Sequence, residues 1–156
     1  MKTILKSTIF AICATVCLTG TAVADGHLEK AASARKAVMQ LYSFNLGQLG
    51  AMAKGAVEYN SETASAAANN LLALVSMNQG TLWPQGSDYV SLGHEAGAMP
   101  EIWSTYPAIT EKSKALMVGA TNMAKVAGMD LASLQGAMGG VGGACGGCHK
   151  VFRKKK

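Results

Sequence analysis

The chain has little of what builds a β-sheet or a nucleic-acid-binding surface. Stretches that alternate apolar and polar side chains are scarce, and β-branched residues are sparse, which argues against a strand-based fold. Only 15% of the 156 residues are charged, and five of the 14 basic ones lie in the last seven positions. The sequence pI of about 9.1 therefore reflects a basic tail and not a basic face, which argues against nucleic acid as a partner.

Long hydrophobic runs are also missing. The apolar stretch Ile9 to Leu18 follows Lys2 and Lys6, and it is shorter than the ~20 residues that span a bilayer. The sequence "TAVA" that follows ends in the small-x-small pattern cut by signal peptidase. We interpret residues 1–24 as a cleaved secretory signal peptide and residues 25–156 as the mature domain, with no stable membrane anchor.

Apolar residues instead recur at intervals of three and four, which is typical of amphipathic helices. The spacing predicts helices over about 28–53, 61–78, 106–127 and 131–152. We expect Asn60 or Ser61 to cap the second helix, Thr105 the third and Asp130 the fourth. The stretch "NQGTLWPQGSDYVSLGHEAGAMPEIW" predicts a long loop between the second and third helices. The predicted fold is all-α, an antiparallel four-helix bundle, with a looser helical array as the alternative.

The expected inward positions form one stripe in each helix. In the first they are Leu28, Ala32, Arg35, Met39, Tyr42, Leu46, Leu49 and Ala53, and in the second Ala64, Ala68, Leu71 and Val75. In the third they are Ile109, Ser113, Leu116, Ala120, Met123 and Ala127, and in the fourth Leu131, Leu134, Met138, Val141, Cys145, Cys148 and Phe152.

The fourth predicted helix carries Cys145, Cys148 and His149 in a Cys-x-x-Cys-His pattern. Positions three apart share a helix face, so both sulfurs can reach one porphyrin edge while the histidine reaches the iron. The pattern predicts covalent attachment of one haem c per chain. A disulfide or redox dithiol is an alternative, although no strand precedes the pair. A zinc site would have to add His27 or His94, which lie in a frayed start and a loop.

Glycine is unusually frequent around this motif. The fourth predicted helix contains Gly136, Gly139, Gly140, Gly142, Gly143, Gly146 and Gly147. Each costs about 1 kcal/mol relative to alanine inside a helix. We therefore expect covalent haem and bundle packing to hold this helix, and the missing side chains to let porphyrin and backbone approach closely.

At this point the sequence resembles the cytochrome c′ family, the class II c-type cytochromes, over nearly the whole mature chain. The motif stands at the C-terminal end in "CGGCHKVFRKKK", and "LWPQGS", "MPEIW" and "SARKAVMQLYSFNLGQL" are also similar to family segments. The resemblance implies a four-helix bundle, usually a homodimer, in the bacterial periplasm. It also implies five-coordinate iron that binds NO and CO.

The resemblance assigns roles on the proximal side of the haem. Cys145 and Cys148 attach the porphyrin and His149 is the axial iron ligand. Arg153, four residues after the histidine, is expected over the proximal face of the imidazole, where it would tune the iron. The alternative for Arg153 is an ordinary cation of the tail.

Further roles fall on the first helix and the long loop. Arg35 interrupts an inward stripe, so a haem propionate is its expected partner, assisted by Lys36 and, more weakly, by Ser87. Met39 matches the distal position, where it would either shield the iron or ligate it as a sixth ligand; simple core packing is a further alternative. Trp83 is expected in the distal pocket, or else as a loop residue that covers the core.

Two functions follow from these alternatives for Met39. A vacant, shielded iron predicts an NO- and CO-binding protein with possible one-electron transfer, and a Met39-ligated iron predicts an electron carrier with unknown periplasmic redox partners. No enzymatic activity is expected, because the predicted distal residues offer no histidine or carboxylate for proton transfer. Residues off the main stripes are candidate dimer contacts, or else bury within the bundle: Ala31, Ala34, Val38, Leu41, Ala66 and Ala67.

Overall fold

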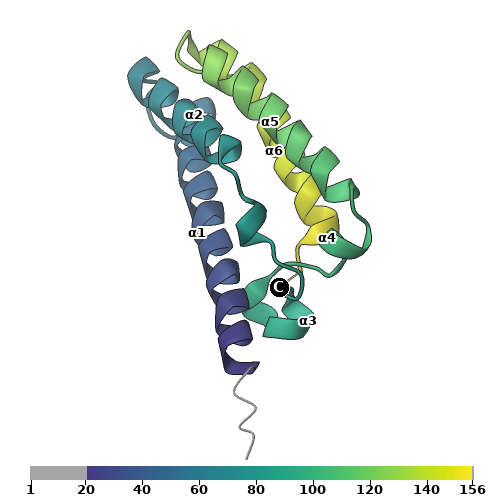
Figure 1. Ribbon diagram of the computed structural model, residues 1–156. Helices are drawn as coiled ribbons and strands as arrows, with labels where there is room; N and C mark the ends of the chain where they lie inside the picture. The colour runs from purple at the N-terminus through teal and green to yellow at the C-terminus, as the bar shows by residue number, and fades with distance from the viewer. Residues whose placement is uncertain (1–20, 156) are drawn as a thin grey trace, which may run out of the picture.

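Four long helices dominate the computed structural model, which describes residues 21–155. They are α1 (Thr21–Ala53), α2 (Ser61–Ser76), α5 (Ala108–Val126) and α6 (Leu131–Phe152). Helix α1 packs against α2 and α6, and α5 packs against the same two helices, with neighbours running in opposite directions (Figure 1). This arrangement confirms the predicted antiparallel four-helix bundle.

The N-terminal signal peptide stays a prediction. Residues 1–20 of the predicted segment 1–24 lie outside the described residues, and α1 begins at Thr21. Within the described part of the chain, no helix combines the length and the apolar character that a membrane span requires.

The helix ends agree with the predicted caps at two of three places. The Asn60 side chain accepts a hydrogen bond from the Thr63 backbone N–H at 2.8 Å, and Asp130 accepts one from Ser133 at 2.7 Å. The predicted Thr105 cap is wrong, because α5 begins only at Ala108 and Thr105 donates to the Glu101 carbonyl at 2.7 Å. Helix α2 also ends at Ser76, two residues earlier than predicted.

The long connection between α2 and α5, residues 77–107, is called the crossing segment below. It contains the short helices η1 (Gly80–Leu82), α3 (Tyr89–Leu92), η2 (His94–Ala96) and α4 (Glu101–Ser104). It lies at the end of the bundle where α1 begins and α6 ends (Figure 1). The predicted loop is therefore a series of short turns that closes one end of the bundle.

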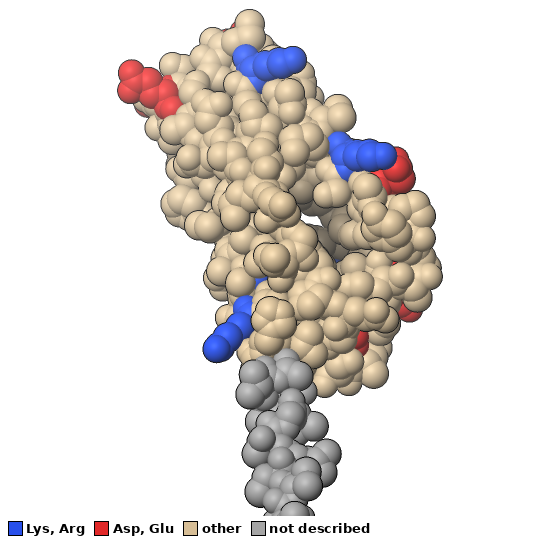
Figure 2. Space-filling model, in the orientation of Figure 1, with Lys and Arg blue, Asp and Glu red and all other residues tan. Residues whose placement is uncertain are grey.

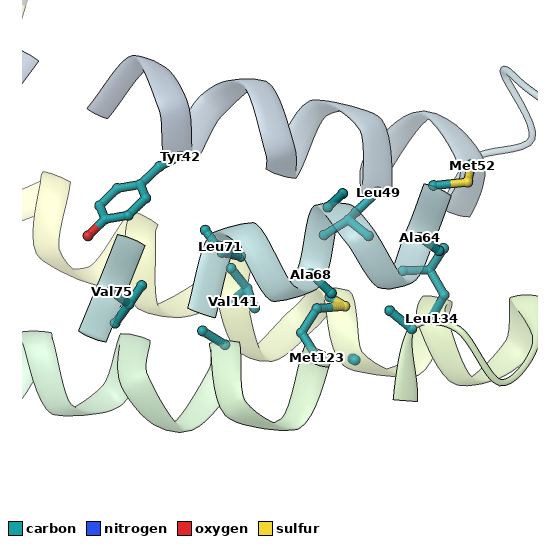
Figure 3. Close-up of a cluster of buried hydrophobic side chains, with 14 of the residues drawn as sticks. Tyr42, Leu49, Met52, Ala64, Ala68, Leu71, Val75, Met123, Leu134 and Val141 are labelled. Carbon is teal, nitrogen blue, oxygen red and sulfur yellow. The ribbon is translucent and has the colours of Figure 1, made fainter. Parts of the chain in front are cut away.

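The core fills the space between the four long helices. Its fully buried larger side chains include Leu49, Leu71, Met123, Leu134 and Val141, and Tyr42 marks one end of the cluster (Figure 3). Two predicted inward positions are wrong. Leu131 is 37% exposed because it is the first residue of α6, where fewer neighbours cover it. Ser113, in the second turn of α5, is also exposed.

Candidate haem site

The two cysteines of the motif lie where two hydrophobic clusters meet. Both are half-buried free thiols, one turn apart on α6. Cys145 packs against the main core, and Cys148 packs against a smaller cluster at the crossing segment. This second cluster consists of Ala98, Ile102 and Phe152, with Trp83, Trp103 and Ile109 against it. The molecule is hollowed on one face, between the half that contains α1 and the corner formed by α4 and α5 (Figure 2).

Burial sets the protonation of the three motif side chains. It raises the pKa of the Cys145 thiol, and burial together with the nearby Cys145 raises the pKa of Cys148, against a smaller opposite effect of Lys112. Burial, followed by the positive charge of Arg153, lowers the pKa of His149. At neutral pH the imidazole is therefore uncharged and keeps a lone pair for a metal.

The basic tail after the motif is fixed to the crossing segment. Its backbone forms a bridge between Arg153 and Ala98, with Met99 N–H donating to the Phe152 carbonyl and Lys154 N–H to the Gly97 carbonyl, both at 2.9 Å. The Arg153 side chain is exposed, yet its charge acts on His149. Residues 152–154 are thus held against the crossing segment beside the motif, and the tuning role of Arg153 stays a prediction.

On α1, Arg35 is buried and Lys36 is not. Arg35 is 3% exposed, and burial lowers its pKa, partly offset by Asp88. Its guanidinium donates to Leu82, Ser87 and Ala96 of the crossing segment. Lys36 points to the surface and pairs with Glu95 at 2.8 Å. The predicted propionate contacts of Arg35, Lys36 and Ser87 are not tested by this geometry.

Met39 lies one turn after Arg35, half-buried against the main core. Tyr42, one further turn along α1, is buried and close enough to Cys145 for the thiol to help raise its pKa, after the larger effect of burial. This part of α1 therefore faces Cys145 of α6. Trp83 is half-buried in the same cluster as Cys148, with the Arg35 guanidinium 4.6 Å from its ring centroid.

Comparison with known proteins places this arrangement in a family. The family model described as cytochrome C′ matches residues 30–153. The chain belongs to the cytochrome c′ family. It is 41% identical over 129 residues to cytochrome c-554 of Cereibacter sphaeroides. This alignment covers 83% of the chain and 84% of the c-554 protein. Members of this family carry covalently bound haem c, and the Cys-x-x-Cys-His segment at the C-terminal end is the predicted place of its attachment.

Solved cytochrome c′ structures share the fold. The protein from Rhodobacter sphaeroides matches with a TM-score of 0.79 and 31% identity, covering 83% of this chain and 98% of that one. An NO-bound variant from Alcaligenes xylosoxidans matches with a TM-score of 0.71 and 26% identity, covering 83% and 97%. Further matches include a carbon monoxide complex from the same organism and a cytochrome c′ with ligand-controlled dimer dissociation.

The residues at the motif fit the haem c of a cytochrome c′. Two free thiols one turn apart point toward apolar side chains, and the neutral imidazole of His149 follows directly. Cys145 and Cys148 would hold the porphyrin, and His149 would take the iron on one side. Haem c, when bound, supplies an iron centre that can take a diatomic ligand or an electron. The protein's own part is to orient this group and to keep water from it.

Two neighbours of the site, Gln79 and Lys112, were not identified from the sequence. Tyr42 donates to the Leu74 carbonyl at 3.2 Å and accepts a hydrogen bond from the Gln79 amide at 2.6 Å, which ties the end of α2 to α1. Lys112 of α5 places its ammonium 3.9 Å from where a Cβ on Gly147 would lie. Their positions in the sequence do not predict these contacts, because each contact depends on how two helices pack against each other.

Proposed function

We propose that this protein is an exported haem c protein whose iron is ligated by His149 alone and binds NO or CO at the opposite face. The observation that carries the proposal is the position of Met39, a neutral side chain on the part of α1 that faces Cys145. The NO and CO complexes of structural relatives support it. The predicted signal segment 1–24 supports the periplasm as its compartment.

Ligand binding suits the site better than catalysis. The neighbouring polar group on α1 is the Tyr42 hydroxyl, and both its donor and an acceptor position are already used by Leu74 and Gln79. Peroxide or oxygen chemistry needs a positioned group that can give up or accept a proton. A shielded iron that binds a small neutral gas needs none.

Substituting Met39 tests whether its sulfur shields or ligates the iron. Leucine keeps the volume of the side chain and removes the thioether. We expect the Met39→Leu holoprotein to keep the high-spin ferrous absorption spectrum of the natural protein. We expect Met39→Ala to bind CO faster by about tenfold, because truncation opens the distal face. Absorption and EPR spectra of both oxidation states, with CO flash photolysis, measure these effects.

A different result would favour the electron carrier. If the natural protein has a low-spin spectrum and Met39→Leu converts it to high spin, the sulfur is a sixth ligand. The iron would then have no vacant face, and one-electron transfer would replace gas binding as the function.

We also propose that the protein is a homodimer, joined through an exposed apolar face of α1. Ala34, Ala37, Leu41 and Phe44 follow one face of this helix, and Phe44 is 67% exposed and Leu41 48%. Of the candidate contacts predicted from the sequence, Ala31, Val38 and Ala67 are buried within the chain and are not available, whereas Ala34, Leu41 and Ala66 are exposed.

Charge on this face should separate the subunits. We expect a Leu41→Glu, Phe44→Glu double variant to sediment as a monomer at concentrations where the natural protein is a dimer, with a Kd raised by at least ~100-fold, because two carboxylates would be desolvated per subunit. Val118→Glu is the control, since Val118 is 70% exposed on α5. A natural protein that sediments as a monomer, or a control that dissociates equally, would contradict the assignment.

A further inference from the structure

Arg35 is the main polar anchor of the crossing segment. One terminal nitrogen, Nη1, donates to the Leu82 carbonyl at 3.1 Å and to Ser87 Oγ at 3.0 Å. The other, Nη2, donates to the carbonyls of Ser87 at 2.7 Å and Ala96 at 3.3 Å. All four acceptors lie in the crossing segment, so one guanidinium fixes η1, the turn before α3 and η2 to the side of α1.

The same guanidinium lies over an aromatic ring. Its central carbon is 4.6 Å from the centroid of the Trp83 ring, a favourable cation–π distance. The backbone of Trp83 is held as well, because its carbonyl accepts a hydrogen bond from Trp103 Nε1 at 3.0 Å. The ring thus has a fixed position and orientation.

Trp83 connects Arg35 to the haem-attachment helix. Its ring packs against the cluster of Ala98, Ile102 and Phe152, which also receives Cys148. Cys148 is one of the two thiols that would hold the porphyrin, so a haem bound there would have this cluster beside it. The contacts therefore run without a break from Arg35, through Trp83, to the wall of the haem pocket.

We propose that Arg35 is a positioning residue that holds Trp83 as one wall of the haem pocket and thereby restricts the entry of ligands to the iron. The planar guanidinium is essential for this role, because it bonds carbonyls on two nitrogens while stacking on the indole. A lysine would keep the positive charge but could not do both. The role is thus distinct from a propionate contact, which requires the charge alone.

The inference rests on the bound haem and not on which gas the iron binds. Its test therefore includes a readout that is independent of iron coordination. The chain contains two tryptophans, and haem quenches the emission of an indole held close to it. Trp103 packs against the same cluster, so its share of the emission is taken from the Trp83→Ala holoprotein. The remaining emission reports whether Trp83 stays at the pocket, even if Met39 ligates the iron.

The experiment compares the Arg35→Lys, Trp83→Ala and double-variant holoproteins with the natural one. We expect Arg35→Lys to raise tryptophan emission several-fold and to speed CO association by about tenfold. Trp83→Ala should speed CO association by a similar factor, and the double variant should show no further increase, because the two residues act through one contact. Lys30→Met is the control and should match the natural protein, since Lys30 is an exposed cation on the same helix with no assigned role at the haem.

Three results would overturn the proposal. Unchanged emission and CO kinetics in Arg35→Lys would mean that the charge alone is required. Unchanged kinetics in Trp83→Ala would mean that the ring is not a wall of the pocket, and this variant decides the matter if Arg35→Lys does not fold. Effects that add in the double variant would mean that the two residues act separately.

Discussion

Replacing Gly119 with alanine is expected to destabilise the holoprotein by about 2 kcal/mol, although alanine is the better helix former. Helices α5 and α6 approach closely at this residue. A methyl group on Gly119 would lie 3.1 Å from the carbonyl carbon of Gly140, 3.2 Å from its oxygen and 3.2 Å from the Val141 nitrogen. These are backbone atoms inside a helix, so they cannot rotate away as a side chain could. The two helices would have to separate.

Gly140 provides the matched control on the opposite helix. A methyl group there would meet only the Gly119 Cα, at 3.9 Å, which is ordinary van der Waals contact. Gly140→Ala should therefore stabilise the protein by up to ~1 kcal/mol through helix propensity. Urea unfolding followed by circular dichroism measures both changes as shifts of the midpoint. Equal shifts in the two variants would show that the close approach of α5 and α6 is not what requires glycine.

The parts of the fold that could be predicted are those fixed by neighbours in the sequence. The three-four spacing located all four long helices, and short-range side-chain acceptors correctly placed the caps at Asn60 and Asp130. The Cys145, Cys148 and His149 motif depends on positions within one turn of α6, so it too could be identified directly. Thr105 failed as a cap because a competing acceptor, the Glu101 carbonyl, lies one turn earlier in α4.

The contacts of Arg35 could not be predicted in the same way. Its position in an inward stripe indicates that a buried charge needs partners, but the acceptors at Leu82, Ser87 and Ala96 are 47 to 61 residues away. Which carbonyls turn toward Arg35 depends on the backbone of the crossing segment. This segment is irregular, so it has no repeating residue spacing from which the direction of a carbonyl could be predicted. The cluster of Ala98, Ile102 and Phe152, against which Cys148 packs, could not be predicted for the same reason.

The glycines of α6 are the positions where the intrinsic helix propensity of the residues disagrees most with the helix that is observed. A methyl group built on Gly136, Gly139, Gly142, Gly143 or Gly146 would meet no heavy atom within 4 Å in the described residues, apart from the neighbouring backbone of α6 itself. Packing within the chain therefore gives no reason for these five glycines. Together they cost about 5 kcal/mol of helix stability, as much as the whole stability of a weakly stable domain.

That cost predicts a helix that depends on its haem. We expect the Cys145→Ala, Cys148→Ala double variant, which cannot attach haem, to lose a large part of the circular dichroism signal of the 22-residue α6. Adding Gly136→Ala, Gly139→Ala and Gly143→Ala should restore most of it, because about 3 kcal/mol of helix propensity returns without a new clash. Circular dichroism at 222 nm, per residue, compares these proteins with the holoprotein.

The location of the glycines, and not their number, is the decisive feature of this prediction. A methyl group on Gly47 of α1 would likewise meet no atom of another described element within 4 Å, so Gly47→Ala adds helix propensity outside α6. It should leave the difference between haem-free and haem-bound helicity unchanged. Equal helicity in the two forms of the natural sequence would contradict the prediction. The expected result is that helix is lost without haem and restored only by alanines in α6. In that case α6 is open before haem is attached, and its half-buried cysteines are then accessible for the attachment.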